Sequence, residues 1–211
     1  MTGHGSDPSS PAHADWRLER TTPSKPSSAM PWLVLVGGFL GADKTTLLLA
    51  AAKELERRGL RSAMIVNDQS ESLVDTHYAA LSGIRSEEVT GGCFCCRFSE
   101  LVRTMEKLRD YAPHAIFAEP VGSCTDVVAT VLRPLRDFRK QFRIAPFSVL
   151  VDPVRAAALM AEDADENLAF LFRKQLEEAD LICFTKSDLD QEIPHLGSRA
   201  VRQLKSRVRI N

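Results

Sequence analysis

The stretch that most constrains the fold is a glycine-rich segment between an apolar run and an amphipathic run. Residues 37–46 read Gly-Gly-Phe-Leu-Gly-Ala-Asp-Lys-Thr-Thr, after the apolar residues 32–36 and before the amphipathic residues 47–58. A strand, a glycine-rich turn, a Lys-Thr pair and a helix are the parts of a phosphate-binding loop. The backbone N–H groups of such a loop surround an anion, and the positive end of the following helix points toward it. The sequence therefore predicts an anion site at residues 37–46.

Several positions in this loop have predictable roles. Gly38 and Gly41 let the backbone approach a phosphate closely. Lys44 is expected to reach the outer phosphates, and Thr45 is expected to hold a magnesium ion. Thr46, the next residue, is a further candidate for contact with the nucleotide.

Asp43 departs from the phosphate-loop pattern. In G-x-x-x-x-G-K-[ST], counted from Gly38, a glycine belongs where this chain has Asp43. A carboxylate there adds a negative charge beside a phosphate and a Cβ where close backbone approach is needed. The alternative interpretation is an ordinary strand-to-helix turn with Lys44 in solvent. The other motifs of the chain have to distinguish it from a phosphate-binding loop.

A cluster of cysteines forms the second motif. Residues 91–96 read Gly-Gly-Cys-Phe-Cys-Cys. A strand would send Cys95 and Cys96 to opposite faces, so a turn is needed to bring the thiols of Cys93, Cys95 and Cys96 together. Such a group suits a soft or borderline metal such as zinc. Buried apolar cysteines or a redox pair remain alternatives, and Cys124 is a weaker candidate for a fourth ligand.

Two further motifs follow apolar runs. Glu119, in Glu-Pro-x-Gly after residues 115–118, lies where ligands bind in open α/β sheets, and it can order magnesium or the attacking water. Gly122 allows the backbone to approach a phosphate. Thr-Lys-x-Asp after residues 181–184 carries Lys186 and Asp188, which suit guanine: the carboxylate accepts two hydrogen bonds from the base, and the lysine stem packs along the ring. A loop lysine and a helix-capping aspartate are the alternative.

The apolar runs alternate with helical patterns along the chain. We expect an α/β fold of the P-loop NTPase class, with a mostly parallel sheet covered by helices on both faces. Pro134 is expected to kink or end one helix, and Asp152-Pro153 to begin another. The predicted strands are 32–36, 62–67, 87–89, 115–118, 147–151, 181–185 and 208–210, and the predicted helices are 47–58, 98–108, 127–135, 153–161, 168–176 and 192–206.

Composition limits the partners of this chain. The 211 residues carry a net charge of −1, so bulk attraction to nucleic acid or to an anionic membrane is not expected. Residues 1–30 are rich in Ser, Pro and Thr and are expected to form a disordered tail, followed by one domain over 31–211. The N-terminus lacks a basic-then-apolar signal pattern, and the clustered thiols suit a reducing compartment, so we expect a cytoplasmic protein.

The order of the four motifs resembles the CobW-type metallochaperone GTPases, which are relatives of the urease and hydrogenase nickel-insertion GTPases. The resemblance covers residues 32–211 and implies GTP, Mg²⁺ and Zn²⁺ as ligands and a client metalloprotein as partner. It assigns catalytic roles to Lys44 and Glu119, and it places Asp68 or Asp75 in the switch region as further magnesium ligands. The remaining assignments are as follows: Gly38, Gly41, Lys44, Thr45, Thr46, Gly122, Lys186 and Asp188 for the nucleotide, and Cys93, Cys95 and Cys96 for zinc.

The sequence differs from this family at two points. Asp43 replaces the loop glycine, and the C-terminal domain that usually follows the GTPase domain is expected to be absent. A metal chaperone that hydrolyses GTP is the leading hypothesis. A degenerate module that binds nucleotide and zinc without hydrolysis is the alternative that Asp43 favours. A small-molecule kinase with a phosphate-binding loop explains neither the cysteines nor Thr-Lys-x-Asp.

Overall fold

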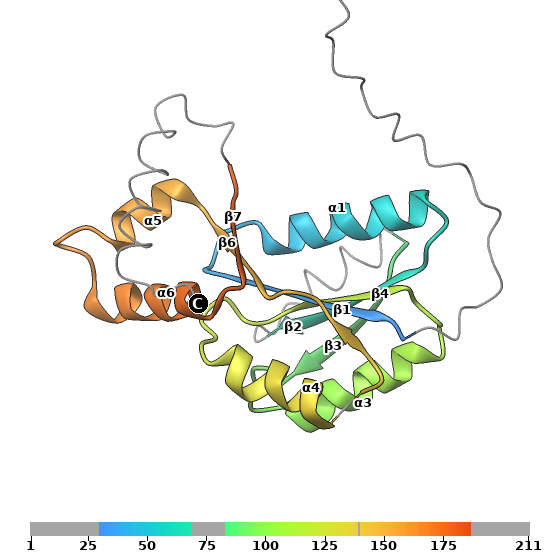
Figure 1. The fold of residues 1–211 in the computed structure, drawn as a ribbon. Coiled ribbons are helices and arrows are strands. Elements are labelled where there is room, and N and C mark those ends of the chain that lie inside the picture. Colours follow the sequence, from blue (N-terminus) through green and yellow to red (C-terminus); the bar gives the residue numbers. More distant parts are fainter. Residues whose placement is uncertain (1–29, 69–82, 139, 187–211) are drawn as a thin grey trace, which may run out of the picture.

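The computed structural model describes residues 30–68, 83–138 and 140–186 (Figure 1). In this part of the chain seven strands form one sheet in the order β3-β2-β4-β1-β6-β7, with the short β5 paired to β1. Every pairing between these strands is parallel. The strands are β1 (Trp32–Gly38), β2 (Ser62–Asp68), β3 (Arg85–Thr90), β4 (Ala115–Glu119), β5 (Arg143–Ile144), β6 (Ser148–Val151) and β7 (Leu181–Phe184).

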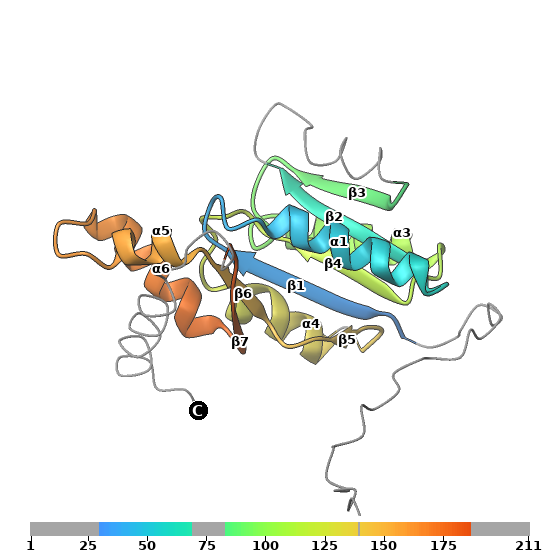
Figure 2. The same cartoon turned by 90° about the horizontal axis from the view of Figure 1, so that it is seen from above.

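Helices cover both faces of this sheet. In Figure 1, α1 (Lys44–Arg57) lies on one face, and α3 (Phe98–Arg109) and α4 (Arg133–Phe138) lie on the opposite face. A π-helical turn, η1 (Val128–Leu132), leads into α4. The last two described helices, α5 (Pro153–Leu159) and α6 (Glu166–Glu178), lie beside β6 and β7 (Figure 2). The predicted α/β fold with a parallel sheet between helices is confirmed.

The core has one cluster on each face, because successive side chains of a strand point to opposite faces. Leu35 of β1 and Ile65 of β2 belong to the cluster that contains Met105 of α3. Met64 of β2 and Leu48 of α1 belong to the other cluster. Both faces of the central strands are therefore buried, which explains why those strands are apolar without alternation.

Most predicted elements occur within a few residues of their predicted bounds. The first helix starts at Lys44, so the lysine of the loop is already helical. Of the two outcomes predicted at Pro134, the helix does not end there, because α4 continues through it; a π-helical turn directly before α4 distorts the helix next to this residue without an N–H. The two-residue strand β5 was not predicted. The expected tail at 1–30, save its last residue, and the elements at 192–206 and 208–210 lie outside the described residues.

None of the helices in the described part of the chain combines the length and the apolar composition that crossing a bilayer requires.

Candidate nucleotide and metal site

The loop between β1 and α1 depends on glycine at two positions. Gly38 has a φ of 141° and Gly41 a φ of 79°, a region that residues with a Cβ rarely adopt. A Cβ on Gly38 would lie 2.7 Å from the carbonyl oxygen of Leu150, and one on Gly41 would lie 2.8 Å from Nη1 of Arg155. Neighbouring segments therefore press against the loop at both positions, and no side chain fits there without a shift.

Lys44, Thr45 and Glu119 meet at the start of α1. Lys44 Nζ lies 3.6 Å from Glu119 Oε1, and the hydroxyl of Thr45 donates a hydrogen bond of 2.8 Å to Glu119 Oε2. Lys44 and Glu119 are both buried, with 6% and 8% of their surface exposed. Because β4 is the sheet neighbour of β1, these residues from two distant motifs lie together. A hydroxyl and a carboxylate oxygen are the ligands that Mg²⁺ prefers, and the ammonium group suits a phosphate.

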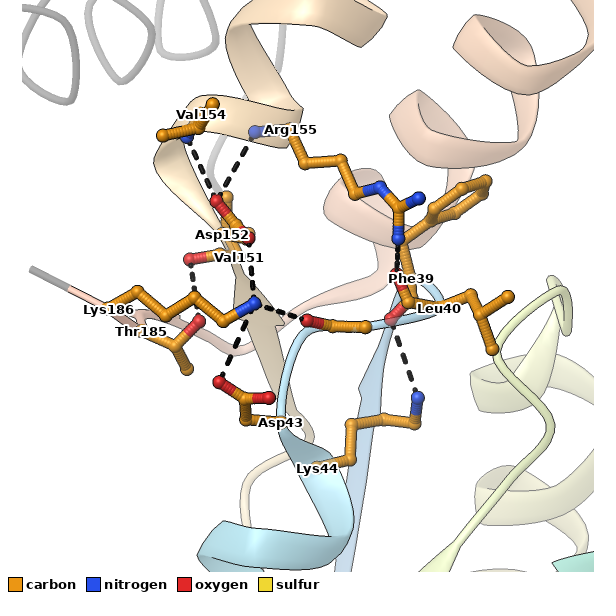
Figure 3. A network of polar contacts seen from close by, with 11 residues as sticks. Phe39, Leu40, Asp43, Lys44, Val151, Asp152, Val154, Arg155, Thr185 and Lys186 are labelled. Atoms are coloured by element: carbon orange, nitrogen blue, oxygen red, sulfur yellow. Dashed lines mark hydrogen bonds and ion pairs between the residues drawn. The ribbon is translucent and has the colours of Figure 1, made fainter. Parts of the chain in front are cut away.

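Asp43 turns its carboxylate toward Lys186 and away from Lys44 (Figure 3). It adopts a left-handed backbone conformation, with φ 60° and ψ 33°, at the N-cap of α1, but its side chain makes no capping hydrogen bond. Its Oδ2 lies 3.6 Å from Lys186 Nζ. The same ammonium group donates to the carbonyl of Gly41 at 2.8 Å and to Oδ2 of Asp152 at 3.0 Å. The carboxylate of Asp43 thus has Lys186 as its cationic partner.

Asp152 and Arg155 connect the end of β6 to the same loop. Asp152 caps α5, as predicted: its Oδ1 accepts hydrogen bonds from the N–H groups of Val154 (3.0 Å) and Arg155 (3.2 Å). The Arg155 guanidinium donates to the carbonyl of Leu40. Burial raises the pKa of Asp152, but the hydrogen bond from Lys186 and the two cap bonds outweigh it, so this pKa lies below its usual value. The Asp152 hydrogen bond in turn raises the pKa of Lys186.

The three clustered cysteines converge in a turn, as the sequence predicts. The Sγ of Cys93 lies 2.6 Å from that of Cys95 and 3.3 Å from that of Cys96, and all three sulfurs are within 4.8 Å of one another. The turn closes with a hydrogen bond from the Arg97 N–H to the carbonyl of Cys93, just before α3. Within the described residues, this is the one group of three or more potential metal ligands at such spacing.

Asn67, the penultimate residue of β2, holds the cysteine turn. Its amide group donates to the carbonyls of Val89 (3.0 Å) and Gly92 (2.7 Å), and its carbonyl oxygen accepts from the N–H of Phe94 at 2.9 Å. Asn67 is only 7% exposed, and the ring of Phe94 is buried in the core. This role of Asn67 was not predicted from the sequence. The available signal was a polar residue at the end of an apolar strand.

The thiols of the turn differ in acidity. Burial raises the pKa of Cys93, but hydrogen bonds from Cys95 and Cys96 outweigh it and bring this pKa to about 7. Burial and the neighbouring Cys93 raise the pKa of Cys95 to about 12. Because the thiolate is the metal-binding form, Cys93 is better prepared than Cys95 to bind a metal at neutral pH.

Gly122 lies against the phosphate-binding loop. A Cβ at this position would be 3.1 Å from the N of Leu40 and 3.5 Å from Lys44 Nζ. The close backbone approach that the sequence suggested for Gly122 is therefore made to the loop itself. It brings the segment after β4 into contact with the loop residues that surround the candidate anion site.

The other predicted site residues are less well placed by the structure. Thr46 is exposed in the first turn of α1. Asp68 ends β2, and its side chain lies outside the described part of the structure. Asp75 and Asp188 lie outside the described residues. Of the guanine motif, only Lys186 is described in contact with the phosphate-binding loop.

Comparisons with known proteins agree with this arrangement. The zinc chaperone YeiR of Escherichia coli (strain K12) is 34% identical over 164 residues, which cover 73% of this chain and 46% of the relative. The zinc chaperone CobW of Sinorhizobium sp is 30% identical over 195 residues, covering 80% of this chain and 53% of the relative. The zinc chaperone YjiA of E. coli is 29% identical over 178 residues, covering 81% and 54%. This chain spans about half the length of these curated relatives.

Solved structures share the fold at low sequence identity. HypB from Helicobacter pylori in complex with nickel has a TM-score of 0.59 and 14% identity, covering 85% of this chain and 75% of that chain. The signal recognition particle 54 kDa protein from Aeropyrum pernix K1 in complex with GDP has a TM-score of 0.54 and 19% identity, covering 86% and 42%. These likenesses support an α/β P-loop fold.

The family comparison covers most of the chain. The family described as "CobW/HypB/UreG, nucleotide-binding domain" matches residues 32–210, which include the phosphate-binding loop, the cysteine turn and the Glu-Pro-x-Gly segment. The expected resemblance is confirmed, and the chain belongs to this CobW-type family of nucleotide-binding domains.

Proposed function

We propose that this chain is a metal chaperone that binds GTP with Mg²⁺, holds zinc or a similar metal on Cys93, Cys95 and Cys96, and transfers it to a client metalloprotein. Hydrolysis of GTP is proposed to change the affinity of the cysteine site for the metal. The observation that carries the proposal is the convergence of three sulfurs within 4.8 Å of one another, on the sheet that also carries the Lys44–Glu119–Thr45 group. The names of the relatives as zinc chaperones support the choice of metal.

Each part of the nucleotide site has a proposed role. The backbone around Gly38 and Gly41 surrounds the phosphates, and Lys44 neutralises their outer charge. Thr45 and Glu119 would provide oxygen ligands for Mg²⁺, which would neutralise phosphate charge, and Glu119 would also order the attacking water.

The remaining predicted residues complete the site. Gly122 senses the outer phosphate, Thr46 adds a contact at the start of α1, and Asp68 or Asp75 completes the magnesium shell. Lys186 packs along guanine while Asp188 accepts two hydrogen bonds from it.

A second candidate is a module that binds nucleotide and zinc without hydrolysis. Asp43 is the observation in its favour, because a carboxylate stands where the loop pattern has glycine. The two candidates share the ligands and differ in turnover. They therefore predict the same binding isotherms and different single-turnover kinetics.

Binding and turnover measurements test the proposal. The chain, purified under reducing conditions, is titrated with zinc and, separately, with GTP, GDP and ATP in the presence of Mg²⁺. We expect about one zinc per chain and a preference for guanine over adenine nucleotides. Replacing Cys93, Cys95 and Cys96 together by serine abolishes zinc binding and leaves GTP binding in place, and Lys44→Ala does the reverse.

The outcomes separate the two candidates from each other and from failure. Hydrolysis of bound GTP in a single turnover supports the chaperone cycle, and binding without hydrolysis supports the second candidate. Zinc affinity that survives the triple serine variant removes the cysteine site. Equal affinity for GTP and ATP removes the guanine assignment.

A further inference from the structure

One helix contacts both segments that border the ammonium group of Lys44. The carbonyl of Phe39, in the phosphate-binding loop, accepts a hydrogen bond of 3.4 Å from Lys44 Nζ (Figure 3). Gly122, in the segment after β4, lies so close that a Cβ on it would be 3.5 Å from the same Nζ. Two side chains of α6 reach these segments: Phe172 contacts the loop, and Gln175 contacts the segment after β4.

The amide of Gln175 fixes the segment after β4. Its Nε2 donates to the carbonyls of Gly122 (2.8 Å) and Cys124 (3.1 Å), which uses both of its N–H groups. Gln175 is only 5% exposed. A buried amide that binds two carbonyls restricts the peptide groups between them, because each broken bond would leave a polar group unpaired away from water.

Phe172 makes the corresponding contact to the loop. Its buried ring meets that of Phe39 edge to face, with the ring centroids 6.3 Å apart. Gln175 follows Phe172 by three residues, so both side chains lie on one face of α6. Gln175 also lines a small cavity together with Gly38 of the loop and Pro120 of the segment after β4. The spacing between the loop and this segment is therefore set by neighbouring side chains of one helix.

We propose that Gln175 is a positioning residue that holds Gly122 at the outer phosphate of the nucleotide, an inference that rests on the proposed binding of GTP. Gly122 has no side chain, so its position depends on its backbone bonds and on the contacts of its neighbours. Gln175 supplies one bond at the carbonyl of Gly122 and a second bond two residues later. Gln175 acts through Gly122 and is assigned no contact of its own with the nucleotide.

The assignment predicts a difference between GTP and GDP. Only GTP carries the outer phosphate that Gly122 is proposed to sense, whereas the loop around Gly38 and Gly41 is proposed to surround the phosphates of both nucleotides. Removing the Gln175 amide therefore weakens the binding of GTP and leaves the binding of GDP in place. A purely structural role would weaken both alike, because a destabilised fold binds neither nucleotide well.

Calorimetric titration of the full chain tests this assignment, with GDP and a non-hydrolysable GTP analogue as probes, each with Mg²⁺. Gln175→Met keeps the length of the side chain and removes both donors. Gln175→Glu keeps its shape and loses at least one of the two donors, whatever its protonation state. We expect both variants to bind the GTP analogue about tenfold more weakly than the parent and to bind GDP within about twofold of it.

The matched control is Glu178→Gln, on the same face of α6. The Glu178 carboxylate accepts hydrogen bonds from the N–H groups of Asp126 and Val128, beyond the segment that Gln175 holds. A glutamine there keeps an acceptor oxygen, so we expect affinities for both probes within about twofold of the parent. Circular dichroism and thermal unfolding confirm that each variant is folded.

Amide hydrogen exchange on the parent gives a second readout, which requires no variant to fold. The GTP analogue should slow the exchange of residues 120–124 more than GDP does, because the outer phosphate is proposed to hold Gly122 only in the GTP complex.

The outcomes distinguish this inference from the proposed function. If the folded Gln175 variants lose affinity for both probes equally, or for neither, Gln175 does not position Gly122 at the outer phosphate, and nucleotide binding by the loop stands. Equal protection of residues 120–124 by the two nucleotides has the same meaning. A parent chain that binds neither probe overturns both the inference and the proposed binding of GTP.

Discussion

Replacing Asp43 by glycine is expected to strengthen GTP binding at least tenfold. The exchange removes a negative charge from the phosphate-binding loop and a Cβ from a residue with a φ of 60°. Glycine adopts that conformation without the steric cost that other residues incur there. We also expect hydrolysis to be slow or absent in the parent and faster in Asp43→Gly.

The expected gain in GTP affinity follows from the charge and the surroundings of Asp43. Two unit charges about 4 Å apart repel by about 1 kcal/mol in water and about 4 kcal/mol at an effective dielectric constant of 20. The side chain of Asp43 is 44% exposed, and Lys186 lies 3.6 Å away, so solvent and the ion pair bring the repulsion toward the lower value. The left-handed backbone of Asp43 is already present without nucleotide, so its cost of roughly 1 kcal/mol lowers the stability of the fold and does not enter the binding free energy. A repulsion of about 2 kcal/mol, nearer the lower of the two limits, exceeds the 1.4 kcal/mol that corresponds to a tenfold change.

Two variants and two ligands separate these contributions. Asp43→Asn removes the charge and keeps the Cβ, so its gain over the parent measures repulsion alone. Inorganic tripolyphosphate has no base, so any effect that acts through Lys186 on the guanine is missing from its affinity. In a Lys186→Met background, Asp43→Asn is expected to produce a larger gain for tripolyphosphate, because the carboxylate has lost its cationic partner.

Calorimetric titration with Mg²⁺ and single-turnover hydrolysis measure the outcome. If the parent binds and hydrolyses GTP as well as Asp43→Gly does, the loop tolerates the carboxylate. The argument for an impaired GTPase then fails, and Asp43 is best explained by its ion pair with Lys186.

Three further predictions concern the base, the metal turn and acid stability. Asp188→Asn is expected to weaken GTP binding by about 2–4 kcal/mol and to improve binding of xanthine nucleotides, whose C2 oxygen prefers a donor; unchanged competition between the two nucleotides contradicts this. Asn67→Ala leaves buried partners in the cysteine turn unpaired, at about 1–3 kcal/mol each, so zinc affinity measured against a chelator should fall at least tenfold while GTP affinity stays within about twofold. The pKa of Asp152 is lowered in the folded state, so its stabilising effect is present above the ordinary value of 3.8 and is lost as the pH falls through the folded pKa. Urea unfolding of Asp152→Asn should therefore show a smaller loss of stability between neutral and acidic pH than the parent, and equal losses would contradict the assigned pairing.

The segments that follow apolar strands could be located from the sequence. Apolar runs located β1, β4 and β7, and parallel strands place the residues after them at one edge of the sheet. The thiols at 93–96 had to converge in a turn, because strand geometry would have separated Cys95 from Cys96. These inferences need only the order of apolar and polar residues within each segment and the parallel direction of the strands.

The supporting contacts could not be derived in the same way. Arg155 binds the carbonyl of Leu40 across 115 positions of the chain, and Asn67 binds that of Gly92 across 25. The pairing of Asp43 with Lys186 also joins distant segments, so sequence analysis identified the charge of Asp43 but not its partner. Side chains that brace a loop from another element have no periodic signature, and only the folded arrangement identifies them.

Glu119 holds two residues of the proposed nucleotide site. Glu119 now contacts both Lys44 and Thr45, the two residues that a nucleotide with Mg²⁺ is proposed to engage. A phosphate competes with Glu119 for the ammonium group of Lys44, and Mg²⁺ competes with it for the hydroxyl of Thr45. Binding is therefore expected to exchange the partners of Glu119. Because Gly122 follows Glu119 by three residues and lies against the backbone of Leu40, we expect this exchange to be felt first where the segment after β4 contacts the phosphate-binding loop.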